Sequence, residues 1–236
     1  MFKWLKKLKG EVPVETYSTR AFHIERRQHA RIRFPTVGAL GDLPFISFQG
    51  HELRPANLSM GGILVTEKVM NGVKPGSIID LVFSWKTPAR EIIQKTNVVR
   101  VSSGGCHLRF EDLNPQLLVN LSLALKPGVR AQKTVRSEQP VMPIQESWKS
   151  ASGEQLLFSS AENEFPDVRI HLPPKELTFS ARDGLRVGTR TPGKEDLHFD
   201  QTAPAWILHD LIVFLTNLPT QTPRVKSLLF QLEKLL

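Results

Sequence analysis

Apolar and polar residues alternate with a period of two through much of residues 31–110, which is typical of strands that bury one face. Turn-forming residues separate the apolar runs, and Gln49-Gly50 stands between two short runs, as a hairpin turn does. No segment with the apolar spacing of a helix interrupts these runs. Short strands joined by turns, without alternating helices, predict a small antiparallel β-barrel.

Beyond residue 110 the period changes to that of a helix. Leu117, Leu118, Leu121 and Leu125 form an apolar face at helical spacing, and Pro127-Gly128 would end the helix. Residues 127–166 then lose periodicity and contain four prolines with many Ser, Glu and Gln residues. We expect this stretch to be a linker, ordered at most around its aromatic residues.

Residues 167–236 combine both periods and predict a smaller C-terminal unit of the α+β class. Three short apolar runs between residues 168 and 189 fit strands. Residues 204–217 are apolar around most of a helical circumference, which predicts a buried helix, and the run is too short to span a bilayer. Residues 224–236 carry an apolar stripe that either packs in the core or binds a partner.

Composition and charge refine this division. Of the 236 residues, 40% are hydrophobic and 23% are charged, as in soluble globular proteins. The net charge of +8 is uneven, because residues 1–35 hold nine Lys and Arg but only three Asp and Glu. Basicity confined to one end argues against a broad nucleic-acid-binding face. We expect a basic N-terminal helix or arm at residues 1–23, a barrel at 24–126, the linker at 127–166 and the C-terminal unit at 167–236.

Residues 1–10 have a basic amphipathic pattern that differs from a secretory signal. In a helix, Met1, Trp4, Leu5 and Leu8 would share one side, and three lysines would occupy the other. Such a helix can rest on an anionic membrane surface. A frayed terminus, or a helix docked on its own protein, explains the pattern as well.

Sequence motifs of enzymes do not occur in the chain. The single cysteine, Cys106, rules out an intramolecular disulfide and a cysteine-based zinc site, and it fits a reducing compartment. The seven histidines form no HxxxH or HExxH pair, and GxSxG, P-loop and GxGxxG motifs do not occur. We therefore expect no catalytic residue, no metal and no resident cofactor.

Two polar motifs lie at the start of the predicted barrel. The first, ERRQHARIRF at residues 25–34, packs four arginines into ten positions, and the second, NLSMGG at residues 57–62, stands between two apolar runs. Asn57 and Ser59 would point the same way in an extended backbone, and the two glycines after them permit unusual backbone angles and close approach of a ligand. Taken alone, the motifs fit a solvated basic arm and an ordinary turn between strands.

Together the motifs resemble those of the PilZ domain family, bacterial receptors for the second messenger cyclic di-GMP. The family pattern is RxxxR followed by [D/N]xSxxG, on a six-stranded antiparallel β-barrel with a following helix. Arg27 and Arg31 match the first part, and Arg26 matches the arginine that often precedes it. Arginine suits this ligand because its planar fork bonds O6 and N7 of guanine and also grips phosphate. The resemblance covers about residues 24–126.

The second part of the family pattern falls on Asn57, Ser59 and Gly62. Asn replaces the commoner Asp at position 57, so this side chain both donates and accepts hydrogen bonds but carries no charge. The resemblance implies that the arginines hold guanine and phosphate, that Asn57 and Ser59 bond base and sugar-phosphate edges, and that glycine gives backbone clearance. The implied residues that bind cyclic di-GMP are Arg26, Arg27, Arg31, Asn57, Ser59, Gly61 and Gly62.

The resemblance implies a non-enzymatic, cytoplasmic receptor that passes ligand occupancy to an unknown downstream protein. The C-terminal unit is our candidate for partner specificity, with a small stability-adding subdomain as the alternative, and residues 1–10 are the candidate for peripheral contact with the inner face of the membrane. Two other functions stay open. One is a β-barrel whose basic arm binds nucleic acid without sequence specificity, and the other is a PilZ-like scaffold that has lost its ligand.

Overall fold

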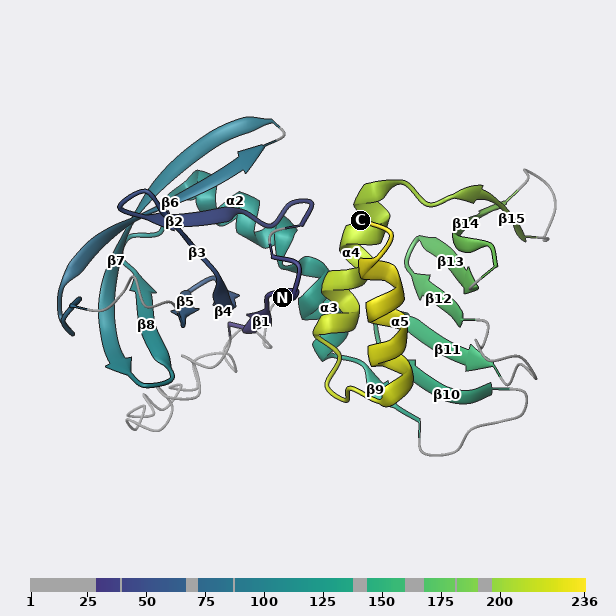
Figure 1. Ribbon diagram of the computed structural model, residues 1–236. Helices are drawn as coiled ribbons and strands as arrows, with labels where there is room; N and C mark the ends of the chain where they lie inside the picture. The colour runs from purple at the N-terminus through teal and green to yellow at the C-terminus, as the bar shows by residue number, and fades with distance from the viewer. Residues whose placement is uncertain are drawn as a thin grey trace, which may run out of the picture.

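The computed structural model describes residues 29–38, 40–66, 72–86, 88–137, 144–159, 168–180, 182–190 and 197–236. Two antiparallel sheets lie at opposite sides of the molecule, and three helices gather between them (Figure 1). These helices are α3 (Lys126–Gln132), α4 (Ala205–Thr216) and α5 (Pro223–Glu233). The predicted N-terminal arm, residues 1–23, lies outside the described residues.

The first sheet has eight strands in the order β1-β4-β5-β8-β7-β6-β2-β3. In chain order they are β1 (Ile32–Arg33), β2 (Phe45–Phe48), β3 (His51–Leu53), β4 (Pro55–Ser59), β5 (Gly62–Val65), β6 (Ile78–Lys86), β7 (Ala89–Ser102) and β8 (Gly105–Phe110). Alternate residues of these strands turn inward and form one apolar core.

The prediction of six strands differs from the eight in this sheet, because one expected strand forms two and the short strand β1 is an additional one. Residues 51–56 look like a single strand in the sequence, but Arg54 separates β3 from β4. Strand β3 pairs with β2, whereas β4 pairs with β1 and β5. Consecutive strands therefore lie near opposite ends of the strand order, and the sheet has to curl back on itself, as Figure 1 shows.

Two local predictions for the first sheet are confirmed. Gln49 and Gly50 have φ angles of 50° and 77°, the left-handed backbone of a tight hairpin turn between β2 and β3. Helix α2 (Pro115–Ala124) follows β8, and its cap residue Asn114 accepts hydrogen bonds from two backbone N–H groups of the first turn. The apolar face of α2 closes the core of the curled sheet.

The second sheet has seven strands in the order β15-β14-β13-β12-β11-β10-β9, each paired with its neighbour in the chain. They are β9 (Val135–Arg136), β10 (Ile144–Lys149), β11 (Gln155–Ser159), β12 (Val168–Leu172), β13 (Lys175–Ser180), β14 (Gly184–Arg190) and β15 (Leu197–Thr202). With α3, α4 and α5 this sheet encloses a second core, which is the α+β architecture predicted for the C-terminal part.

The prediction of a linker at residues 127–166 is wrong for the described part of that range. Helix α3 and strands β9, β10 and β11 lie there, and Trp148 and Phe158 are fully buried with their rings edge to face at 5.7 Å. Pro127 accounts for this error, since proline breaks a helix from its interior but is well tolerated in the first turn, and here it lies in the first turn of α3. The second unit therefore begins directly after α2.

Helix α4 is buried on opposite sides, which explains its apolar circumference. Val213 belongs to the core of the first sheet, whereas Leu211, Ile212, Phe214 and Leu215 belong to the core of the second. The prediction of a buried helix is confirmed, because α4 packs against both hydrophobic cores. Within the described part of the chain, the structure has no helix with the length and apolar character needed to cross a membrane.

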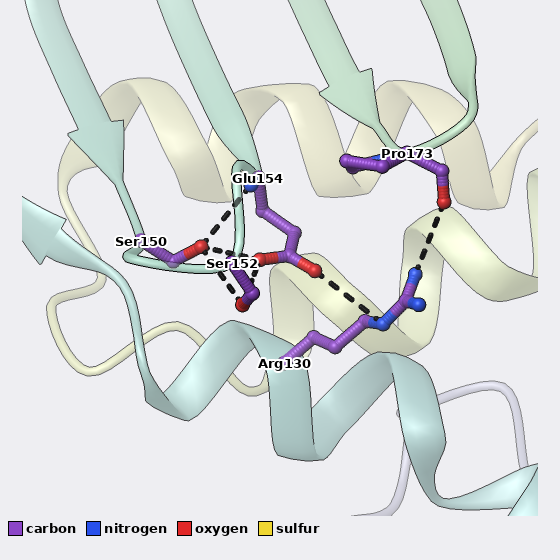
Figure 2. A network of polar contacts seen from close by, with 5 residues as sticks. All are labelled: Arg130, Ser150, Ser152, Glu154 and Pro173. Atoms are coloured by element: carbon purple, nitrogen blue, oxygen red, sulfur yellow. Dashed lines mark hydrogen bonds and ion pairs between the residues drawn. The ribbon is translucent and has the colours of Figure 1, made fainter.

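A polar network fastens α3 to the second sheet (Figure 2). The Arg130 guanidinium lies 3.4 Å from a carboxylate oxygen of Glu154 and donates a hydrogen bond to the carbonyl oxygen of Pro173. Ser150 and Ser152 donate to the other carboxylate oxygen. Burial alone would raise the pKa of Glu154, but these two hydroxyls, its own backbone N–H and Arg130 outweigh it and hold the pKa below its ordinary value.

Candidate functional site

A groove of about 740 Å³ lies on the outer face of the first sheet, over β4, β5 and β8. The pleat of the strands decides which side chains reach it. In β8, Cys106 and Leu108 turn into the core, whereas His107 and Arg109 turn outward. The polar residues that line the groove are His29, Arg31, Asn57, Ser59, His107 and Arg109.

The turn between β4 and β5 forms the floor of the groove, and Ser59 organises it. The Ser59 hydroxyl donates a hydrogen bond to the carbonyl oxygen of Gly62 at 3.1 Å and accepts one from the backbone N–H of Gly61 at 3.3 Å. The side chain is 8% exposed. Ser59 therefore shapes the backbone of the turn, and its hydroxyl is engaged by the protein itself.

The two glycines of the turn have different surroundings. A Cβ on Gly62 would stand 2.1 Å from the carbonyl oxygen of Leu108, so the backbone of β8 occupies that space. A Cβ on Gly61 would meet only the Cδ2 atom of His29, at the ordinary contact distance of 3.4 Å. Neither residue has a left-handed φ. Close packing against β8 explains why residue 62 is a glycine, whereas Gly61 faces the groove.

The two motifs converge on this groove. Arg31 is exposed and directly precedes β1, where Arg33 stands in register with Asn57 of β4. Asn57 also stands in register with Leu64 of β5, next to the turn. Of the seven predicted ligand-binding residues, five line the groove, namely Arg31, Asn57, Ser59, Gly61 and Gly62. Arg26 and Arg27 lie outside the described residues.

Strand β8 adds two polar residues that the motifs do not include. Arg109 stands in register with Gly62, and His107 with Leu64, so both side chains reach the groove from the strand beside the turn. The Arg109 guanidinium lies 3.0 Å from the Glu111 carboxylate and remains half exposed. Period-two alternation of β8 in the sequence would have placed both residues opposite Cys106, on the outer face.

The described part of the groove is cationic. Two guanidinium groups, those of Arg31 and Arg109, stand at its wall. Cys106 lies behind it in the core, where burial raises the pKa of the thiol and disfavours the reactive thiolate. Among the described residues, no group of three or more His, Cys, Asp or Glu side chains is arranged to hold a metal ion. This set of donors suits an anionic ligand that also presents hydrogen-bonding edges.

Comparison with known families agrees with this site. The model of the PilZ domain family matches residues 25–124, a range that contains both motifs and every strand that lines the groove. No curated protein matches the chain significantly. Residues 25–124 are therefore a PilZ domain.

Proposed function

We propose that this protein is a non-enzymatic receptor that binds cyclic di-GMP in the groove of its PilZ domain. One observation carries the proposal: Arg31 from the first motif and Asn57, Ser59, Gly61 and Gly62 from the second line a single groove. The family is generally one of cyclic di-GMP receptors. Because this ligand is a bacterial second messenger, we place the receptor in the cytoplasm.

The chemistry of the groove fits the two phosphates and two guanines of the ligand. Arg31, with Arg26 and Arg27 before it in the sequence, supplies guanidinium forks that bond guanine O6 and N7 or phosphate oxygens. Arg109 adds a second cation from β8. The volume of about 740 Å³ lies within the range of small-molecule sites.

The polar turn complements these cations. The Asn57 amide both donates and accepts, which suits the edge of a base, and the half-buried position of this residue limits its freedom. Gly61 leaves a flat floor below His29, where a base or a sugar-phosphate can approach the backbone. Ser59 acts through the turn it holds, so its contribution is to the shape of the site.

Calorimetric titration with cyclic di-GMP tests the proposal. The charge-assisted contacts of one arginine are worth a few kcal/mol, so Arg31→Ala and Arg27→Ala should each weaken binding by roughly one to three orders of magnitude. Arg33→Ala is the matched control, because its exposed side chain lies two residues from Arg31 and outside the lining of the groove. Unchanged affinity in both test variants would refute the proposed role of these arginines.

Single-stranded DNA serves as the competing ligand in the same titration. Binding to DNA that is tighter than binding to cyclic di-GMP, and that weakens steeply with salt, would support a nucleic-acid-binding arm instead.

We assign partner binding to the C-terminal unit and membrane contact to residues 1–10. Both assignments are tested by deleting each segment and measuring whether the cellular response and membrane sedimentation persist.

A further inference from the structure

Strand β1 pairs with β4 along one edge only, so the backbone groups along its other edge need other partners. In the antiparallel pair with β4, the backbone N–H of Phe34 donates toward Ala56. The backbone groups of Arg31 and Arg33 alternate with these and face away from β4. Polar backbone groups at a buried strand edge need hydrogen-bond partners.

Side chains of the second unit supply those partners. The Oδ1 atom of Asn217 accepts a hydrogen bond from the backbone N–H of Arg33 at 2.7 Å, and its Nδ2 atom donates to the carbonyl oxygen of Arg33 at 3.1 Å. Gln132, the last residue of α3, donates to the carbonyl oxygen of Arg31 at 2.7 Å. Two side-chain amides thus take the place of a neighbouring strand along the arginine-bearing segment.

The Asn217 amide is itself held in place. This residue caps the C-terminal end of α4, is 3% exposed and donates a further hydrogen bond to the carbonyl oxygen of Val213 at 2.9 Å. Gly128 of α3 presses on the same spot, because a Cβ there would stand 2.6 Å from Ile32 and 3.2 Å from the Asn217 amide nitrogen. Helix α3 therefore packs closely against both β1 and the Asn217 amide.

We propose that Asn217 is a positioning residue for the ligand groove. By holding both backbone groups of Arg33, it fixes β1 and with it Arg31, which lies at the groove just before this strand. Gln132 adds direct support at Arg31. The proposal rests on the proposed function, and it makes the second unit part of the affinity of the site. Since coupling is reciprocal, ligand bound at Arg31 in turn stabilises the contact of α4 with β1.

Asn217→Ala tests this role, with Gln221→Ala as the matched control. Gln221 also donates to carbonyl oxygens at the end of α4, including that of Leu215 at 2.7 Å, but these acceptors all lie in the second unit. In Asn217→Ala, we expect hydrogen exchange of the Arg33 amide to accelerate at least tenfold and the affinity for cyclic di-GMP to fall about tenfold. The control should leave both quantities unchanged.

A double-mutant cycle separates positioning from a general loss of stability. If Asn217 acts through Arg31, the penalty of Asn217→Ala should shrink to less than about threefold in an Arg31→Ala background. Additive penalties would overturn the proposal, as would a protected Arg33 amide in Asn217→Ala. If that variant does not fold, Gln132→Ala takes its place, since this exposed side chain contacts the same strand and its loss should weaken binding about threefold or more.

The unmodified chain distinguishes this inference from the function on which it rests. Absence of cyclic di-GMP binding by the unmodified chain refutes the proposed function and this inference with it. Binding by the unmodified chain that persists at equal affinity in Asn217→Ala and Gln132→Ala refutes only the positioning role.

Discussion

Replacement of Gly62 by alanine tests why the motif has a glycine at this position. The added Cβ would stand 2.1 Å from the carbonyl oxygen of Leu108 and 3.1 Å from the Cα of Arg109. Both atoms belong to the backbone of β8, so no side-chain rotation relieves the contact. The strand itself has to move away from β5.

The expected loss of stability follows from that displacement. Ordinary van der Waals contact begins near 3.4 Å, so the Leu108 carbonyl would have to retreat by more than 1 Å. This movement strains two cross-strand pairs, Gly62 with Arg109 and Ile63 with Leu108. At about 1 kcal/mol for each hydrogen bond lost and about 1–3 kcal/mol for overpacking, Gly62→Ala should reduce the free energy of unfolding by about 3 kcal/mol or more. In a chain of this size, the thermal midpoint should fall by about 10 °C.

Gly61→Ala is the matched comparison, because both glycines have backbone angles open to alanine. Its Cβ meets only His29 Cδ2 at 3.4 Å, so stability should stay within about 0.5 kcal/mol of the unmodified chain. The methyl group enters the groove, and affinity for cyclic di-GMP should fall about tenfold. Urea unfolding followed by circular dichroism measures stability, and calorimetry measures affinity. A Gly62→Ala protein within about 1 kcal/mol of the unmodified chain would refute the packing explanation.

Three further predictions concern α3 and its contact with Glu154. Gly128→Ala should destabilise the protein by about 1 kcal/mol although alanine favours helix, because overpacking against the fully buried Ile32 outweighs propensity; a higher urea midpoint would contradict this. Arg130→Ala should cost about 2 kcal/mol, since Glu154 is 1% exposed and would lose its cation, while the partial exposure of Arg130 limits the loss. Because the folded-state pKa of Glu154 is depressed, its stabilisation is present above about pH 4.5 and is lost as pH falls through that lower pKa. The stability difference between the unmodified chain and Glu154→Gln should therefore shrink below pH 4.5, and a difference that stays constant down to pH 3 would show that the carboxylate is not stabilised.

The strands and helices with strong periodicity could be predicted from the sequence. Period-two runs predicted β5 to β8, and leucine spacing predicted α2, because one buried face imposes its period on the residues. The gathering of Asn57 with Arg31 could be predicted only through the family resemblance, since residues distant in the chain meet through strand pairing. Local pattern contains no information about that pairing.

Some roles of these residues depend on contacts that the local sequence pattern does not encode. The family resemblance assigns Ser59 and Gly62 to the ligand, and the structure adds that Ser59 bonds its own turn and that Gly62 makes room for the backbone of β8. The motifs do not include Arg109, although its register with Gly62 brings it to the groove. Pro127 correctly indicates the end of one helix, but the same residue also lies in the first turn of the next helix, and the sequence pattern does not distinguish the two cases.

Strand β1 belongs to both halves of the molecule, and this limits how a signal can leave the groove. One edge pairs with β4 beside the motif turn, and the other is completed by Asn217 and Gln132. A ligand shifts the balance between two arrangements of β1 only by the difference in its affinity for them. Because that coupling is reciprocal, a partner that displaces α4 changes ligand affinity by the same factor by which the ligand changes the affinity for the partner. On the proposed function, a small movement of α4 against β1 would shift Arg31 directly, because Asn217 and Gln132 bond the backbone of residues 31 and 33.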